Sequence, residues 1–319
     1  MTSPTIVLAG PTGDLGSRIA TALLVRGADL RALLRPDAPA ADRDRLTSLG
    51  ATVVSADPAD VDALARVLLG TDCVVSALNG LGEVILDRQS VLLDAAVRAG
   101  VPRFISSDYS ADFTKTEPGR NRNFDLRREF SGRADRASIK VTSVLNGAFM
   151  DMLGAEMPII QPRIRRVLHW GEVDQPLDFT TKDDTAAYTA AAAMDETAPR
   201  TLRIAGDTVS AREIAQTMTE VTGQPYRTLR AGSVGGLGAM IRLTQLVAPE
   251  HGSVFPAWQG MQYMRDMFSG TAQLVPLDND RYPDLTWTRL HEQLADGPLA
   301  GRSPHSSRRL ATTRAGLAS

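Results

Sequence analysis

One segment near the N-terminus constrains the fold of this chain more than any other. Its glycines, Gly10, Gly13 and Gly16, lie in the sequence GPTGDLG, between an apolar, β-branched segment at 5–9 and an amphipathic one at 14–26. A strand–turn–helix unit of this kind needs glycine for a tight bend, for close approach of the backbone to a pyrophosphate, and for packing of the helix against the strand. Ordinary turns can carry a similar spacing. The strand before and the helix after favour a dinucleotide site at the helix N-terminus.

The alternation of strand and helix continues to about residue 150. Short apolar segments separated by amphipathic ones predict a parallel sheet that helices cover on both faces. Right-handed crossovers then give the doubly wound α/β arrangement, so we expect residues 1–150 to form an NAD(P)-binding Rossmann domain. After the first strand, the expected strands are 30–34, 52–55, 73–77, 103–106 and 140–145. After the first helix, the expected helices are one that ends near Gly50, then 61–69 and 84–99.

Beyond residue 150 the pattern loosens, and we expect a smaller α+β substrate-side domain at 151–300. Its clearest helices are the Ala-rich segment 181–194 and the segment 210–222, which begins with a capping box. Whether the chain returns to the first sheet is left open by the pattern. Residues 301–319 are mostly Ser, Arg, Ala and Thr, and we expect a disordered tail there.

Two further segments bear on a ligand site. The polar segment 110–123 contains Pro118 and Gly119 and predicts a long loop over the carboxyl ends of the strands, where ligands bind in such sheets. The segment 255–268 is rich in Met and aromatic residues. Its spacing fits a buried helix slightly better than the lining of an apolar substrate pocket.

Composition narrows the class of protein. Thirty-five basic and 37 acidic residues leave a formal charge of −2, so nothing favours nucleic acid or an anionic membrane as a partner. No apolar stretch approaches the ~20 residues of a membrane-spanning helix, and no signal peptide is evident. The single cysteine, Cys73, lies in the apolar run DCVVSAL, which predicts a buried, inert thiol in a reducing cytoplasm. The four histidines are far apart in the sequence, so we expect no metal site.

The end of the second expected strand bears on the choice of cofactor. An acidic residue there suits the ribose diol of NAD, whereas an arginine suits the 2′-phosphate of NADP. Arg35 follows Leu34 directly and favours NADP(H) over NAD(H), although Asp37 lies two residues later. Arg35 can also be read as an ordinary surface arginine. Arg43 and Arg45 either add positive charge nearby or belong to a solvated helix face.

Several segments together resemble one family. They are GPTGDLG at 10–16, LLRPD at 33–37, LGATVVSADPAD at 49–60, TDCVVSALNG at 71–80, AAVRAGVPRFISSDYSADF at 95–113 and VLNGAFMD at 144–151. They are similar to the NmrA-like and isoflavone-reductase-like branch of the atypical short-chain dehydrogenases. FTTKDDTAAYTAAAA at 179–193 and TLRIAGDTVSAREIAQTMTEVTG at 201–223 extend the resemblance over most of the chain.

The resemblance implies an NADP-binding domain and assigns residues to each part of the cofactor. By this resemblance, the pyrophosphate contacts Gly10, Thr12, Gly13, Leu15 and Gly16. The 2′-phosphate contacts Arg35, the adenine contacts Asp57, and the ribose side is lined by Ala77, Leu78 and Asn79. The nicotinamide lies beside Ser107, Asp108, Tyr109, Asn146, Gly147 and Phe149. Simpler roles remain open for two of these residues. Asp57 can close a turn at the end of a strand, and Asn146 can form a structural bond to a loop.

The chain departs from the family at the catalytic position. Reductases of the isoflavone type carry a lysine in a pattern like F-x-x-K, where this chain has Phe124 and then Arg127. A buried lysine can exchange a proton near neutral pH, whereas an arginine stays charged and can only orient or polarise a carbonyl. Tyr109 is followed four residues later by Phe113, so the usual Y-x-x-x-K pair is absent. Tyr109 is a candidate proton donor or an aromatic residue packed against the cofactor or the loop.

Two functions fit these features. The first is an NADPH-dependent reductase that delivers hydride to a small, aromatic or conjugated carbonyl-type substrate, with Tyr109 or water as proton donor and Arg127 polarising the acceptor. The second is an NmrA-like redox sensor that binds the dinucleotide without turnover and signals to a regulatory protein partner. The missing lysine favours the sensor. We favour the reductase.

Overall fold

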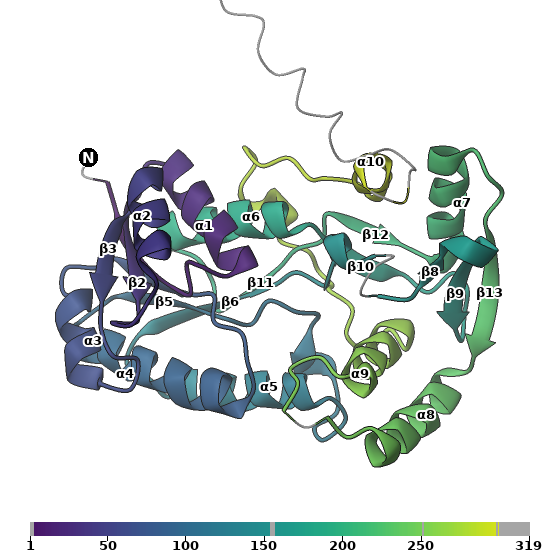
Figure 1. The fold of residues 1–319 in the computed structure, drawn as a ribbon, viewed down its shortest axis with the longest axis horizontal. Coiled ribbons are helices and arrows are strands. Elements are labelled where there is room, and N and C mark those ends of the chain that lie inside the picture. The colour runs from purple at the N-terminus through teal and green to yellow at the C-terminus, as the bar shows by residue number, and fades with distance from the viewer. Residues whose placement is uncertain (1–2, 154–156, 251, 298, 300–319) are drawn as a thin grey trace, which may run out of the picture.

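A seven-stranded sheet forms the centre of the molecule (Figure 1). The computed structural model describes residues 3–153, 157–250, 252–297 and 299, so the tail predicted at 301–319 lies outside the described residues. The strand order is β11-β6-β5-β4-β1-β2-β3, and every pairing in the sheet is parallel. The strands are β1 Thr5–Ala9, β2 Asp29–Leu34, β3 Thr52–Ser55, β4 Cys73–Ser76, β5 Arg103–Ser106, β6 Lys140–Leu145 and β11 Thr201–Arg203. The doubly wound α/β prediction is confirmed.

Helices cover both faces of this sheet (Figure 1). One face carries α1 Asp14–Val25, α2 Ala40–Leu49 and α6 Lys182–Met194, and the other carries α3 Val61–Leu68, α4 Gln89–Arg98 and α5 Arg122–Ala134. The β1 residues show why the strands are apolar throughout. Ile6 and Leu8 enter the core under α1 and α6, while Val7 enters the core under α3 and α4. A strand buried on both faces has no polar side, as in other parallel sheets.

The chain returns to the first sheet after residue 150. Helix α6 packs on α1, and β11 pairs with β6 at the edge of the sheet. The alanines of α6 allow this close approach, since Ala190 and Ala192 are fully buried. Two ion pairs join the helices, one between Asp14 and Lys182 and one between Arg18 and Asp183.

The remaining elements form a second unit beyond the carboxyl ends of the strands (Figure 1). It holds two three-stranded sheets with the orders β12-β10-β7 and β13-β9-β8. Its strands are β7 Ala148–Phe149, β8 Ile160–Gln161, β9 Arg166–Trp170, β10 Leu177–Thr180, β12 Asp207–Val209 and β13 Arg227–Gly232, and its helices are α7 Ala211–Thr222, α8 Val234–Val247, α9 Ala257–Phe268 and α10 Leu290–Asp296. Met264, Met267 and Phe268 of α9 pack into its core. The preference for a core helix at 255–268 is therefore confirmed for these side chains.

Two connections differ in detail from the sequence-based expectation. The helix expected at 84–99 begins as the π-helix η1, Glu83–Arg88, before it continues as α4. The expected loop at 110–123 contains the short 3-10 helix η2, Phe113–Lys115, and its last residues already belong to α5. Much of this loop is buried, because it makes backbone and side-chain hydrogen bonds to α9 and to the segment 272–275. Within the described residues, no helix is long and apolar enough to cross a membrane.

The environment of Cys73 leads to a test of this packing. Cys73 in β4 is fully buried, and burial raises the pKa of its thiol to about 12. Only the thiolate reacts readily, so we expect the folded protein at pH 8 to resist a disulfide reagent that labels the guanidinium-unfolded chain within minutes. Absorbance of the released thiol measures both reactions. Rapid labelling of the folded protein would contradict the packing around β4.

Candidate functional site

Two glycines of the GPTGDLG turn are required by the protein's own packing. Gly10 has φ of +80°, and a Cβ added there would lie 2.8 Å from the Ala77 carbonyl oxygen. A Cβ added at Gly16 would lie 2.0 Å from the Gly10 carbonyl oxygen. These contacts press the start of α1 against the turn and the end of β4, so larger residues at Gly10 and Gly16 would displace backbone.

Gly13 has a different environment. Its backbone is extended, with φ of −70° and ψ of 165°, and an added Cβ would meet only the Gly10 carbonyl oxygen, at 3.6 Å. The protein itself therefore has room for a side chain at this position. Gly13 is also the N-cap of α1 and offers no side-chain cap to the first amide groups of the helix. Open space before uncapped amides is what a bound phosphate requires.

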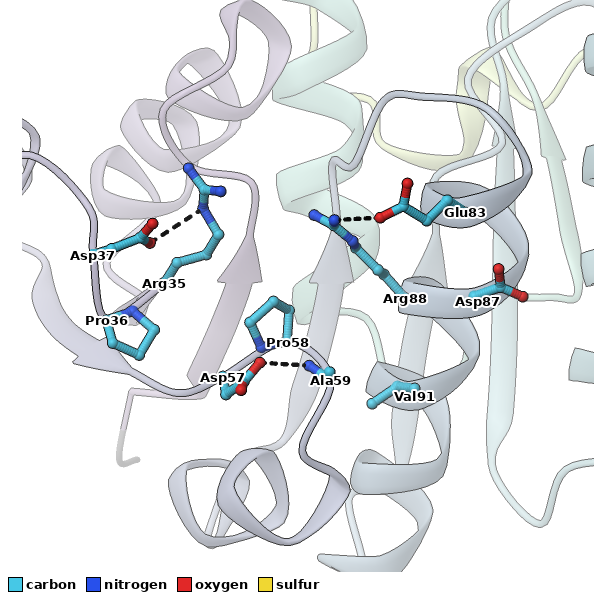
Figure 2. A pocket seen from close by; sticks show the side chains of 10 residues that line it. All are labelled: Arg35, Pro36, Asp37, Asp57, Pro58, Ala59, Glu83, Asp87, Arg88 and Val91. Atoms are coloured by element: carbon cyan, nitrogen blue, oxygen red, sulfur yellow. Dashed lines mark hydrogen bonds and ion pairs between the residues drawn. The ribbon is translucent and has the colours of Figure 1, made fainter. Parts of the chain in front are cut away.

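Two adjoining pockets extend from this turn along the carboxyl ends of the strands. The smaller, of about 260 Å³, is lined by the turn residues Gly10 and Thr12 and by Leu78 and Asn79 after β4. The larger, of about 590 Å³, lies between the ends of β2 and β3 and the start of the α4 helix (Figure 2). Arg35, Pro58 and Arg88 line both pockets, which together form one groove.

Arg35 lies at the end of β2 with an exposed side chain, as a ligand for a phosphate would need. Its only ion pair among the described residues is with Asp37, at 3.7 Å between Nε and Oδ1. Arg43 instead donates to Ser55 Oγ and to the carbonyl oxygens of Arg35 and Pro36. Arg43 therefore shapes the turn that carries Arg35, and the suggestion that it adds charge to the site has no support from its contacts.

Asp57 closes a turn and also lines the groove. Its Oδ1 accepts a hydrogen bond from the Ala59 amide at 2.9 Å, which closes the turn after β3. The same residue lines the larger pocket between Arg35 and Arg88 (Figure 2).

A buried glutamine ties the ends of β4 and β5 together. Gln89 at the start of α4 is fully buried, and its Oε1 accepts from Ser76 Oγ at 2.7 Å and from the Ser107 amide at 2.9 Å. Ser107 Oγ in turn donates to the Leu78 carbonyl oxygen at 2.6 Å. Sequence reasoning missed Gln89. Its only signal is an amide side chain within the apolar stripe of a predicted helix.

Buried polar atoms without a partner gather in residues assigned to the nicotinamide. Both amide atoms of Asn146, after β6, lack a hydrogen bond within the described residues, as does Asp108 Oδ1 after β5. Leaving such an atom unpaired costs about 1–3 kcal/mol. A group that both donates and accepts, such as a carboxamide, would satisfy them, so these residues fit the nicotinamide end of a dinucleotide.

Three other predicted cofactor residues make contacts within the protein itself. Gly147 has φ of +70°, and a Cβ there would lie 2.3 Å from the Asp178 carbonyl oxygen. Leu15 and Phe149 are partly buried against the core under α1 and α6, and Lys182 Nζ lies 5.9 Å from the Phe149 ring centroid.

The position of Tyr109 favours packing over proton donation. Its side chain is 7% exposed and belongs to the core under α1 and α6. Burial raises the pKa of Tyr109 above its ordinary value, and its buried hydroxyl has no hydrogen-bond partner within the described residues. A hydroxyl in the core is poorly placed to protonate a substrate.

Arg127 projects from α5 and is also largely buried, at 8% exposure. One of its terminal nitrogens, Nη1, donates to the Asn123 carbonyl oxygen at 3.1 Å, while Nε has no partner within the described residues. Helix α5 begins at the N-cap Asn121, whose side chain accepts from the Phe124 amide. Arg127 is thus a buried cation, held by the bond to Asn123, whose Nε–H can still donate to another group.

Comparison with known proteins identifies the family of this chain. The model of the NmrA-like family matches residues 2–233. The chain belongs to the NmrA-like family. A bifunctional pinoresinol-lariciresinol reductase of Linum perenne is 27% identical over 316 residues, which cover 91% of this chain and 97% of that protein.

Solved structures share the fold of the NmrA-like chain. A complex of AtPrR2 with NADP+ and (+)pinoresinol superposes with a TM-score of 0.78 at 22% identity, and covers 92% of this chain and 99% of that one. The binary complex of leucoanthocyanidin reductase with NADPH from Vitis vinifera has a TM-score of 0.75 at 19% identity, with coverages of 93% and 100%.

The contrast between Gly13 and Gly16 can be tested directly. We expect Gly13→Val to fold with a melting temperature within a few degrees of the parent and to lose NADPH affinity at least about a hundredfold, roughly 3 kcal/mol. The added methyl groups would occupy the space in front of the α1 amides. Gly16→Val, the matched control, should instead lose more than about 4 kcal/mol of stability. Thermal melts and nicotinamide fluorescence measure both effects, and unchanged binding by folded Gly13→Val would remove the pyrophosphate assignment.

Proposed function

We propose that this NmrA-like protein is an NADPH-dependent reductase that delivers hydride to a small, aromatic or conjugated carbonyl-type substrate. The observation that carries the proposal is the open space at Gly13, next to the turn residues Gly10 and Thr12, which line a groove that also contains Arg35. The partnerless polar atoms of Asn146 and Asp108 follow the neighbouring strands β6 and β5. Arg35 suits a phosphorylated adenosine, and the unpaired atoms of Asn146 and Asp108 suit a carboxamide.

Arg35 supports NADP(H) as the cofactor rather than NAD(H). A guanidinium binds phosphate through paired, charge-assisted hydrogen bonds, and the exposed ion pair with Asp37 is weak enough to be exchanged for them. The solved complexes that share the fold contain NADP+ or NADPH.

Arg127 has the charge that the reaction requires. When bound, the cofactor supplies hydride to an electrophilic carbon, and negative charge then builds on the substrate oxygen. A buried, permanently charged guanidinium stabilises that charge in a site of low dielectric constant. Arginine does not give up its proton, so we assign the proton to water rather than to Arg127 or Tyr109.

The relatives guide the choice of substrate class. Curated relatives are named for the reduction of pinoresinol and lariciresinol, and one solved complex holds (+)pinoresinol. We therefore propose an aromatic substrate for this chain. The buried single cysteine suits a reducing compartment, and we place the protein in the cytoplasm.

The second candidate function is a redox sensor that binds NADP(H) without turnover and signals to a protein partner. It is favoured by the burial of Tyr109 and by Arg127, which the resemblance to isoflavone-type reductases places at the position of a lysine. Both features remove a side-chain proton donor.

The cofactor proposal leads to a test with Arg35→Ala. Loss of a charge-assisted phosphate contact, worth roughly 1.5–3 kcal/mol, should weaken NADPH by about one to two orders of magnitude and NADH much less. Arg45→Ala is the control, since Arg45 pairs with Asp42 and does not line the groove. Calorimetric titration of both cofactors gives the result. Equal affinity of the unaltered protein for NADH and NADPH would contradict the preference.

The reductase and the sensor differ in turnover. We expect NADPH oxidation with members of a panel of aryl aldehydes, ketones, quinones and enones, measured by stopped-flow absorbance. Arg127→Ala should lower kcat/KM at least about tenfold, on the order of 1.4 kcal/mol, with little change in NADPH affinity. Tyr109→Phe and Arg136→Ala should each change kcat/KM less than about twofold, because the Tyr109 side chain lies in the core and Arg136 is exposed after the end of α5. Tight NADPH binding without turnover on any substrate would favour the sensor.

A further inference from the structure

The wall of the groove opposite Arg35 is built by a π-helix. The segment η1 Glu83–Arg88 widens the first turns of the helix that follows β4, and Glu83, Asp87 and Arg88 line the larger pocket. Short π-helical segments of this kind are frequent at functional sites. No residue of this wall was assigned to the cofactor from the sequence.

Arg88 reaches across the groove toward Arg35. Figure 2 shows the two guanidiniums approaching each other from the end of β2 and from the helix, with Asp57 and Pro58 below them. Among the residues that line either pocket, Arg35 and Arg88 are the only basic ones, and each lines both pockets. The side chain of Arg88 is 41% exposed.

The charges of this groove do not suit a phosphate dianion unless both arginines face it. Four carboxylates line the larger pocket, those of Asp37, Asp57, Glu83 and Asp87. Each arginine is paired with a carboxylate near it in the sequence, Arg35 with Asp37 and Arg88 with Glu83. A single guanidinium would neutralise only one of the two negative charges of the phosphate. The remaining charge would be repelled by the nearby carboxylates. Arg43 and Arg45 are engaged elsewhere, with the turn after β2 and with Asp42.

We propose that Arg88 is a second cation for the 2′-phosphate and that Glu83 competes with the phosphate for it. The inference rests on the proposed NADP(H) function and adds a specificity-determining residue to that site. An exposed ion pair such as Arg88–Glu83 contributes little stability, whereas two guanidiniums around one phosphate bind through several charge-assisted hydrogen bonds. Arg88 therefore leaves Glu83 when the phosphate binds, and Glu83 lowers the affinity by holding Arg88 in the free protein.

Adenosine fragments separate this role from the rest of the cofactor. The probes are 2′,5′-ADP, which carries the 2′-phosphate, and 5′-AMP, which lacks it, titrated by calorimetry at low salt. Arg88→Gln should weaken 2′,5′-ADP about tenfold and 5′-AMP less than about twofold. Arg88→Lys keeps the charge but loses the planar guanidinium. Its affinity for 2′,5′-ADP should therefore lie between that of the unaltered protein and that of Arg88→Gln. Thermal melts establish that each variant folds.

Glu83→Gln tests the competition in the opposite direction. Freeing Arg88 should tighten 2′,5′-ADP about two- to threefold, with no change for 5′-AMP. Asp87→Asn is the matched control, because Asp87 lines the same wall and forms no ion pair among the described residues. An equal gain in Asp87→Asn would overturn the competition and indicate a general effect of charge.

The outcomes distinguish this inference from the proposed function. If Arg35→Ala weakens 2′,5′-ADP while Arg88→Gln leaves it unchanged, the NADP(H) site stands and the role of Arg88 is wrong. If folded Arg88→Gln loses 2′,5′-ADP and 5′-AMP equally, Arg88 serves the adenosine or the helix rather than the phosphate. If the unaltered protein binds both fragments equally, the NADP(H) proposal fails with it.

Discussion

The contact between Gly16 and the Gly10 carbonyl oxygen is the constraint on which the rest of the site depends. It brings the first turn of α1 so close to the end of β1 that no side chain fits between them. The α1 N-terminus therefore opens at the carboxyl edge of the sheet, beside the ends of β2 and β4. Every other part of the groove is placed relative to this fixed helix end.

The same helix links the first half of the chain to the second. Asp14, in the first turn of α1, pairs with Arg18 and with Lys182 of α6, and these cations lower the pKa of its carboxyl below the usual value. The Lys182 amide at the start of α6 is capped by Asp151, which follows β7. Residues from both sides of the domain boundary expected at 150 thus hold the start of α1, the start of α6 and the segment after β7 in one arrangement.

The polar groups of the site are not arranged for the greatest stability. Asn146 and Asp108 keep buried atoms unpaired, and four carboxylates surround two guanidiniums in the groove. Interiors usually satisfy such groups, and exceptions gather where a ligand completes them. Other buried polar residues are paired, as Asp112 is with Arg203 and Asn121 is with Asp266.

Sequence alone determined the local features of this protein. The positions of the first six strands, the glycine turn, Arg35 after β2 and the buried Cys73 all follow from periodicity and from the special geometry of glycine, which act over a few residues. Side-chain direction and partners did not follow, because they depend on elements distant in the chain. Only the fold shows that Tyr109 packs in the core under α1 and α6, that Arg43 bonds to the backbone of a turn, and that Arg88 lies opposite Arg35. The return of α6 and β11 to the first sheet was likewise decided by packing. An Ala-rich helix and a three-residue strand have too little hydrophobic pattern to predict which elements they contact.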